Sequence, residues 1–70
     1  MRSYLVIIEK AENNYSAYSP DLPGCITTGA TIEETKQNMR EAIEGHLEML
    51  KESGEPVPES TSTAEYVAID

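Results

Sequence analysis

A single long helical pattern is the main constraint on the fold of this chain of 70 residues. Thr31 and Glu34 have the spacing of a capping box, in which two side chains accept hydrogen bonds from unpaired amides at a helix start. Gly54, with a proline two residues later, is typical of a helix end. These signals predict a helix over residues 32–53, which is roughly 33 Å long at 1.5 Å per residue.

The predicted helix is apolar along one face only. Its apolar residues follow the spacing of a single stripe: Met39, Ala42, Ile43, Leu47 and Leu50. A neighbouring row is acidic: Glu41, Glu44, Glu48 and Glu52. This row indicates either a solvated face, which is the simpler interpretation, or a contact surface for a basic partner. A helix with one apolar stripe can cover only one face of a sheet.

Strand patterns lie on both sides of the helix. Residues 3–10 are apolar on both faces for most of their length, which predicts a strand in the interior of a sheet. Residues 15–19 and 25–28 form two shorter strand patterns, and Pro23-Gly24 between them favours a type II turn. Residues 65–69 are rich in β-branched and aromatic side chains and predict a last strand.

The order of elements predicts an α+β fold with β-β-β-α-β connectivity. The first three strands fit an antiparallel meander, and a right-handed return through the helix places the last strand parallel to the first. We therefore expect a four-stranded mixed sheet of order 3-2-1-4, with the helix packed on one face. This is the order of an RNase H-like core. We expect residues 1–70 to be one domain, with no C-terminal DNA-binding domain.

A chain of this length is marginally stable as a monomer, because small domains bury a small fraction of their surface. The sequence has one cysteine and one histidine, too few for an internal disulfide or a closed zinc site. We therefore expect self-association, as a homodimer or a higher oligomer. The second copy would cover the open face of the sheet or an exposed edge strand.

The charge of the chain restricts its partners. Thirteen acidic residues against five basic ones give a net charge of −8, which argues against direct binding of nucleic acid. The same charge permits a basic protein partner, although solubility alone would also explain it. No apolar run has the ~18 residues of a membrane span, and the N-terminus lacks the features of a signal peptide. With its free thiol, the chain is expected to be cytoplasmic.

No catalytic, metal or cofactor site is expected. His46 and Cys25 have no partners in sequence that would make a nucleophile and a base, and a core position is the simpler interpretation of each. Two-metal nucleases with an RNase H-like core need a carboxylate in the first strand. Here Glu9 comes only at the end of that strand. Other acids are available: Glu33, Glu34, Glu41 and Asp70. We expect the protein not to be an enzyme.

The segment between the second strand and the helix carries a specific pattern. Pro20-Asp21-Leu22-Pro23-Gly24-Cys25 is followed by Thr28-Gly29-Ala30-Thr31 at the helix start. With this pattern, the chain resembles the N-terminal domain of the HicB-like antitoxin family over most of its length. The resemblance implies a degraded, non-catalytic RNase H-like fold. It also implies an antitoxin that binds and neutralises a small basic mRNA-cleaving toxin of HicA type.

Two alternatives to this function remain open. The chain is also consistent with a solitary, oligomeric HicB-like binding or structural module that has no toxin partner. A residual metal-dependent nuclease is less favoured, because the central acid is missing. If a toxin binds, the candidate contacts are the loop tip and the acidic row: Asp21, Leu22, Pro23, Glu41, Glu44 and Glu48. For the loop tip, a tight turn with no partner is the simpler interpretation.

Overall fold

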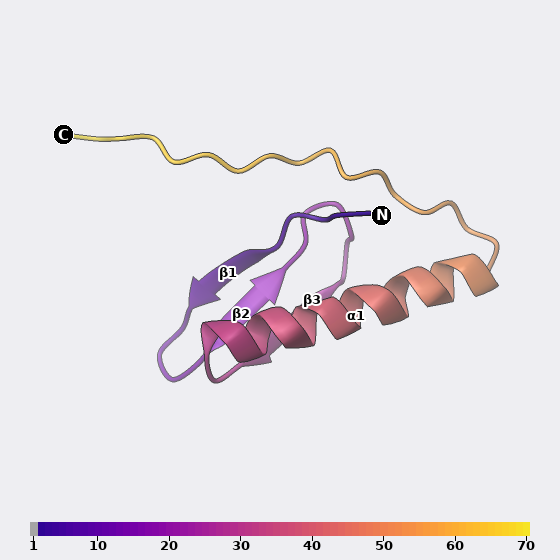
Figure 1. Cartoon of the computed structure of the whole chain (residues 1–70), viewed down its shortest axis with the longest axis horizontal. Coiled ribbons are helices and arrows are strands. Elements are labelled where there is room, and N and C mark those ends of the chain that lie inside the picture. The colour runs from indigo at the N-terminus through magenta and orange to yellow at the C-terminus, as the bar shows by residue number, and fades with distance from the viewer. Residues whose placement is uncertain (1) are drawn as a thin grey trace.

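A computed structural model describes residues 2–70. Its elements are β1 (Ile7–Lys10), β2 (Tyr15–Tyr18), β3 (Ile26–Gly29) and α1 (Ile32–Glu52), as Figure 1 shows. The strands form an antiparallel sheet in the order β1-β2-β3, and an extended segment follows α1. The predicted α+β class and the order of the first four elements are confirmed.

The predicted fourth strand does not form, so the prediction of a four-stranded sheet with order 3-2-1-4 is wrong for this structure. Residues 65–69 are extended but pair with no strand, and Tyr66, Val67 and Ile69 are exposed. The C-terminal segment runs apart from the sheet in Figure 1. Strand propensity reflects packing against neighbouring strands, and this segment has no neighbour.

The first strand is shorter than predicted and lies at an edge of the sheet. Its ladder with β2 begins at the pair Ile7–Tyr18, because the chain turns away from β1 after Tyr18. Residues 3–6 therefore lead into β1 without a partner on the β2 side. The apolar pattern on both faces predicted an interior strand. In the structure, however, the outer edge of β1 is not paired with any strand among residues 2–70.

The hydrophobic core lies between the sheet and α1. Leu22 and Met39 are the largest apolar side chains that are fully buried, and Ala17 and Cys25 pack with them. Partly buried residues from the start of the chain and from α1 surround this cluster: Tyr4, Val6, Ile8, Ala42, Ile43 and Leu47. The predicted apolar stripe of the helix is thus the face that packs on the sheet.

Both predicted ends of the helix are confirmed by their hydrogen bonds. At the start, Thr31 Oγ1 accepts a hydrogen bond from the Glu34 amide at 3.0 Å, as the capping box predicts. Glu34 Oε2 accepts from the Ala30 amide at 3.2 Å, one residue before the N-cap amide that the reciprocal half of the box would use. At the end, Gly54 has a φ of 71°, which favours glycine. The amides of residues 54 and 55 donate to the carbonyls of residues 51 and 50, the pattern of a Schellman motif.

The helix approaches the sheet closely at Gly29. A Cβ atom at this position would lie 2.5 Å from Thr35 Oγ1 and 2.7 Å from the Thr35 amide nitrogen. Thr35 is fully buried, and its hydroxyl donates to the Thr31 carbonyl at 2.7 Å. One turn further on, Asn38 Nδ2 donates to the Thr28 carbonyl at 2.9 Å. These contacts attach the first turns of α1 directly to β3.

We expect Gly29→Ala to destabilise the fold by about 1–3 kcal/mol, because the added methyl group would overlap the backbone of α1. The matched control is Gly45→Ala, where an added Cβ meets no atom within 4 Å. This substitution should stabilise the protein by about 0.5–1 kcal/mol, since glycine is a poor helix former. Urea unfolding followed by circular dichroism measures both. A Gly29→Ala variant as stable as the parent would contradict the close contact.

Candidate protein-binding surfaces

The loop between β2 and β3 consists of two consecutive turns. The Leu22 amide donates to the Ser19 carbonyl at 3.1 Å, and the Cys25 amide donates to the Leu22 carbonyl at 3.0 Å. Gly24 has a φ of 82°, which is the geometry that the predicted type II turn requires. The Leu22 side chain is completely buried, whereas Pro23 is exposed. Leu22 is therefore a core residue. Of the two predicted contact residues Leu22 and Pro23, only Pro23 presents its side chain to solvent.

The third residue of the loop tip, Asp21, binds the C-terminal segment of the same chain. Its carboxylate accepts hydrogen bonds from the Thr61 hydroxyl at 3.1 Å, the Ser62 amide at 3.2 Å and the Ser62 hydroxyl at 2.9 Å. Burial raises the pKa of Asp21, but the hydrogen bonds from Ser62 and Thr61 outweigh it and leave the pKa below its ordinary value. The ionised carboxylate is thus an anchor for residues 61–62.

A second contact holds the same segment slightly earlier in the sequence. The Tyr4 hydroxyl donates to the Pro58 carbonyl at 2.6 Å. Together, the Tyr4 and Asp21 contacts fix residues 58–62 beside the start of the first strand and the β2–β3 loop. Sequence reasoning did not find either contact, because each joins residues that are 40 or more positions apart.

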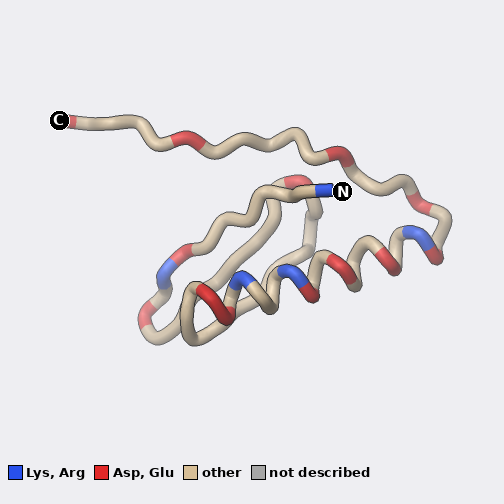
Figure 2. The backbone as a smooth tube through the Cα atoms, viewed as in Figure 1, with Lys and Arg blue, Asp and Glu red and all other residues tan. Residues whose placement is uncertain are grey.

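The acidic row of α1 faces solvent. Glu41, Glu44 and Glu48 are all exposed, and Figure 2 shows acidic residues distributed along the helix. The Gln37 side-chain amide donates to Glu41 at 3.1 Å, which is the only hydrogen bond to these three carboxylates among the described side chains. The structure does not gather the loop tip and the acidic row into one site, since they belong to separate elements.

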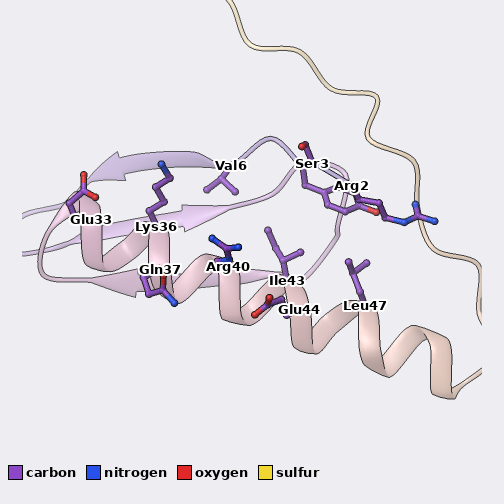
Figure 3. Close-up of a pocket in the computed structure, with 11 residues that line it drawn as sticks. Arg2, Ser3, Val6, Glu33, Lys36, Gln37, Arg40, Ile43, Glu44 and Leu47 are labelled. Carbon is purple, nitrogen blue, oxygen red and sulfur yellow. The ribbon is translucent and has the colours of Figure 1, made fainter.

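A groove with a volume of about 690 Å³ runs between α1 and residues 2–6, which lead into β1 (Figure 3). Its apolar wall is formed by Val6, Ile43 and Leu47. Its polar lining includes Arg2, Lys36 and Arg40, which are three of the five basic residues of the chain, and also Glu33 and Glu44. The groove thus brings together three bases and two acids of an otherwise acidic protein. The bases are scattered in sequence, so only the fold reveals their grouping.

The opposite face of the sheet carries an exposed apolar row. Ile7 pairs with Tyr18, and Tyr18 pairs with Ile26, so that the three side chains are aligned across the strands. Tyr18 is 40% exposed and Ile26 is 70% exposed. Such a row on a small protein is suited to contact with another protein.

The residues considered for chemistry do not form a catalytic arrangement in the part of the chain that is described. Cys25 is 4% exposed, and burial raises the pKa of its thiol, which disfavours the reactive thiolate. His46 is partly buried on α1. Over residues 2–70, no three histidine, cysteine or acidic side chains are grouped so that they could hold a metal ion. Nor is any helix in this range both long and apolar enough to cross a membrane.

The fold and these surfaces define a small acidic α+β domain with an exposed acidic helix face, an exposed apolar row on its sheet and a groove beside α1. Residues 4–70 match the family described as the HicB-like antitoxin of bacterial toxin–antitoxin systems. The chain belongs to this family, as its loop and helix-start pattern predicted.

Several relatives are similar over most of this chain. An uncharacterized 14.9 kDa protein from the rep–hol intergenic region of Haemophilus phage HP1 is 38% identical over 91% of this chain, which spans 48% of that protein. A UPF0150 protein of Thermoplasma acidophilum is 45% identical over 79% of this chain and 81% of its own length. A UPF0150 protein of Synechocystis is 44% identical, with 80% and 72% covered. No solved structure matches the chain.

We predict that the contact between Asp21 and the C-terminal segment depends on pH. Because hydrogen bonds lower the pKa of Asp21 in the folded state, the contact is complete above the ordinary value of 3.8 and is lost as the pH falls through the lowered pKa. An NMR titration of the Ser62 amide should show this loss. Asp21→Asn should abolish the titration at Ser62 and increase proteolysis after residue 58.

The matched control for this prediction is Glu12→Gln in the exposed turn between β1 and β2. This variant removes one carboxylate without touching the C-terminal segment, so the Ser62 titration should persist. If the NMR signal of the Ser62 amide changes neither with pH nor in the Asp21→Asn variant, the C-terminal segment is held by other contacts.

Proposed function

We propose that this protein is an antitoxin that binds and neutralises a small basic mRNA-cleaving toxin of HicA type through protein–protein contact. The observation that carries the proposal is the match of residues 4–70 to the HicB-like antitoxin family. The net charge of −8 supports a basic partner, because complementary charge steers association and suppresses wrong partners.

The contact surface that we propose includes the acidic row of α1 and the exposed part of the loop tip. Glu41, Glu44 and Glu48 present three carboxylates on one solvent-facing side of a well-capped helix. Asp21 and Pro23 would add contacts at the loop tip, while Leu22 would support the shape of that loop from within the core. Since Asp21 is already bound to residues 61–62, a toxin at the tip would meet these residues as well.

The remaining features follow from the same role. We propose that the protein is not an enzyme, acts without metal or cofactor, does not bind nucleic acid or membranes directly, and works in the cytoplasm as a single domain. The β-β-β-α order supports a relationship to RNase H-like proteins.

A second candidate function is a self-associating HicB-like module that has no toxin partner. The exposed row of Ile7, Tyr18 and Ile26 and the unpaired edge of β1 favour self-association in either case. We propose a homodimer or a higher oligomer. Co-expression with a basic protein encoded next to this gene separates the two functions. Rescue of growth together with co-purification would support the antitoxin, and failure of both would support the module.

We predict that reversing charge on the acidic row weakens toxin binding. Glu41→Lys combined with Glu48→Lys should reduce affinity roughly 10- to 100-fold and should make binding less sensitive to salt, since favourable charge pairs become repulsive. Glu44 is left unchanged because it also lines the groove between α1 and residues 2–6. Calorimetry or surface plasmon resonance with the purified toxin measures the change.

The matched control for charge reversal is Glu12→Lys combined with Glu55→Lys. Both residues are exposed and lie outside α1, so the net charge changes equally at other places. Equal losses in both double variants would mean that only net charge matters. The loop tip is tested with Asp21→Lys. If this variant binds the toxin with unchanged affinity, the loop tip has a structural role only.

A further inference from the structure

Residues 58–62 form a strap that is tied to the β2–β3 loop by hydrogen bonds to Asp21. We propose that this strap is an autoinhibitory contact, in which Thr61 and Ser62 occupy the Asp21 carboxylate and a basic side chain of the toxin displaces them. The inference rests on the toxin binding proposed above and adds a regulation of the loop tip. Closure of the strap and binding of the toxin to Asp21 are then mutually exclusive.

The strap uses most of the hydrogen-bonding capacity of Asp21. The Oδ1 atom accepts from the hydroxyl groups of Thr61 at 3.1 Å and Ser62 at 2.9 Å, and the Oδ2 atom accepts from the Ser62 amide at 3.2 Å. An ionised carboxylate has about four acceptor positions in all. An arginine that binds a carboxylate through two parallel hydrogen bonds needs both of its oxygens. Such a side chain therefore competes with the strap for Asp21.

Little packing holds the strap in its closed position. Pro58 and Ser62 are half-buried, the three residues between them are exposed, and none of the five belongs to the hydrophobic core. Hydrogen bonds hold its two ends, from the Tyr4 hydroxyl to the Pro58 carbonyl and from Ser62 to Asp21. Segments with few buried contacts open locally at a low cost in free energy. The strap can therefore open while the core stays intact.

The exchange at Asp21 favours a cationic partner. Thr61 and Ser62 donate from neutral groups, whereas a lysine or an arginine donates from a charged group, and hydrogen bonds between two ionised groups are stronger. The net charge of −8 also attracts basic proteins. A neutral or acidic protein lacks both advantages and leaves the strap closed. The strap thus adds a barrier against wrong partners, which is one of the two ways to achieve specificity.

The contact at Tyr4 supports closure from a distance. Pro58 lies only three positions before Thr61, so that fixing Pro58 raises the effective concentration of the next residues at Asp21. Weakening this tether should open the strap without altering any residue of the loop tip. The apparent affinity for a partner falls with the fraction of molecules in the binding-competent state. A chain with a weakened tether should therefore bind the toxin more tightly.

Calorimetry with strap variants tests this proposal, and its probe is the basic protein that co-purifies with the chain in the co-expression described above. Tyr4→Phe removes one tether and keeps the aromatic ring, and Thr61→Val with Ser62→Ala removes two of the three hydrogen bonds to Asp21. Each variant should raise toxin affinity roughly 2- to 10-fold, the usual net contribution of one hydrogen bond.

The NMR signal of the Ser62 amide reports independently on the strap. In Asp21→Ala, which lacks the contact, this signal takes the position of the open strap. The signal should move toward that position in Tyr4→Phe without toxin, and in the parent when toxin is added. Circular dichroism verifies that all variants remain folded.

Two controls separate the strap from other effects. Tyr66→Phe also removes one tyrosine hydroxyl, from a fully exposed side chain outside the strap, and should leave toxin affinity unchanged. Asp21→Ala removes the carboxylate for which the strap and the toxin compete. In the Asp21→Ala background, Tyr4→Phe should therefore no longer raise toxin affinity.

The results that would overturn the proposal are distinguishable. If the Ser62 signal stays in place in Tyr4→Phe, this tether does not control the strap. If the signal moves but toxin affinity stays the same, strap and toxin bind at separate places, and if affinity falls, the strap supports the toxin surface. A gain that persists in Asp21→Ala would mean that the competition lies elsewhere. A parent chain that binds no toxin would overturn the proposed function itself.

Discussion

The contact between Gly29 and Thr35 determines how the rest of the molecule is arranged. Because Gly29 has no side chain, the start of α1 can lie directly against the end of β3. The hydrogen bond from Asn38 to Thr28 continues this attachment along the helix. As a result, α1 packs most closely on β3 and least on β1. The groove between α1 and residues 2–6 lies on this less closely packed side of the molecule.

The β2–β3 loop connects this arrangement to the C-terminal segment. Leu22 is buried in the core and fixes the loop there, while the neighbouring Asp21 binds residues 61–62 on the outside of the loop. A short pattern of prolines, glycine and one aspartate therefore has two structural roles. Any partner that contacts Asp21 at the loop tip would therefore also lie next to residues 61–62.

Local signals predicted the local structure well. The capping box at Thr31, the glycine after α1 and the Pro23-Gly24 turn each need only a few adjacent residues, and the structure confirms all three. The apolar stripe likewise identified the face of α1 that packs on the sheet. Features that join distant residues were missed. Two such features are the grouping of Arg2 with Lys36 and Arg40 and the hydrogen bonds of Asp21 to residues 61–62. No periodic pattern in the sequence indicates either of them.

The one clear error concerns the first and last strands, and a single physical cause accounts for it. Residues 3–10 are apolar on both faces, which predicted neighbours on both sides, and residues 65–69 have the composition of a strand. Among residues 2–70, the outer edge of β1 stays unpaired and residues 65–69 pair with no strand. Sequence patterns report which surfaces are suited to burial, but they do not report which molecule buries them. An apolar pattern that remains exposed in a single chain therefore marks a surface that is suited to burial, as Tyr66, Val67 and Ile69 do here.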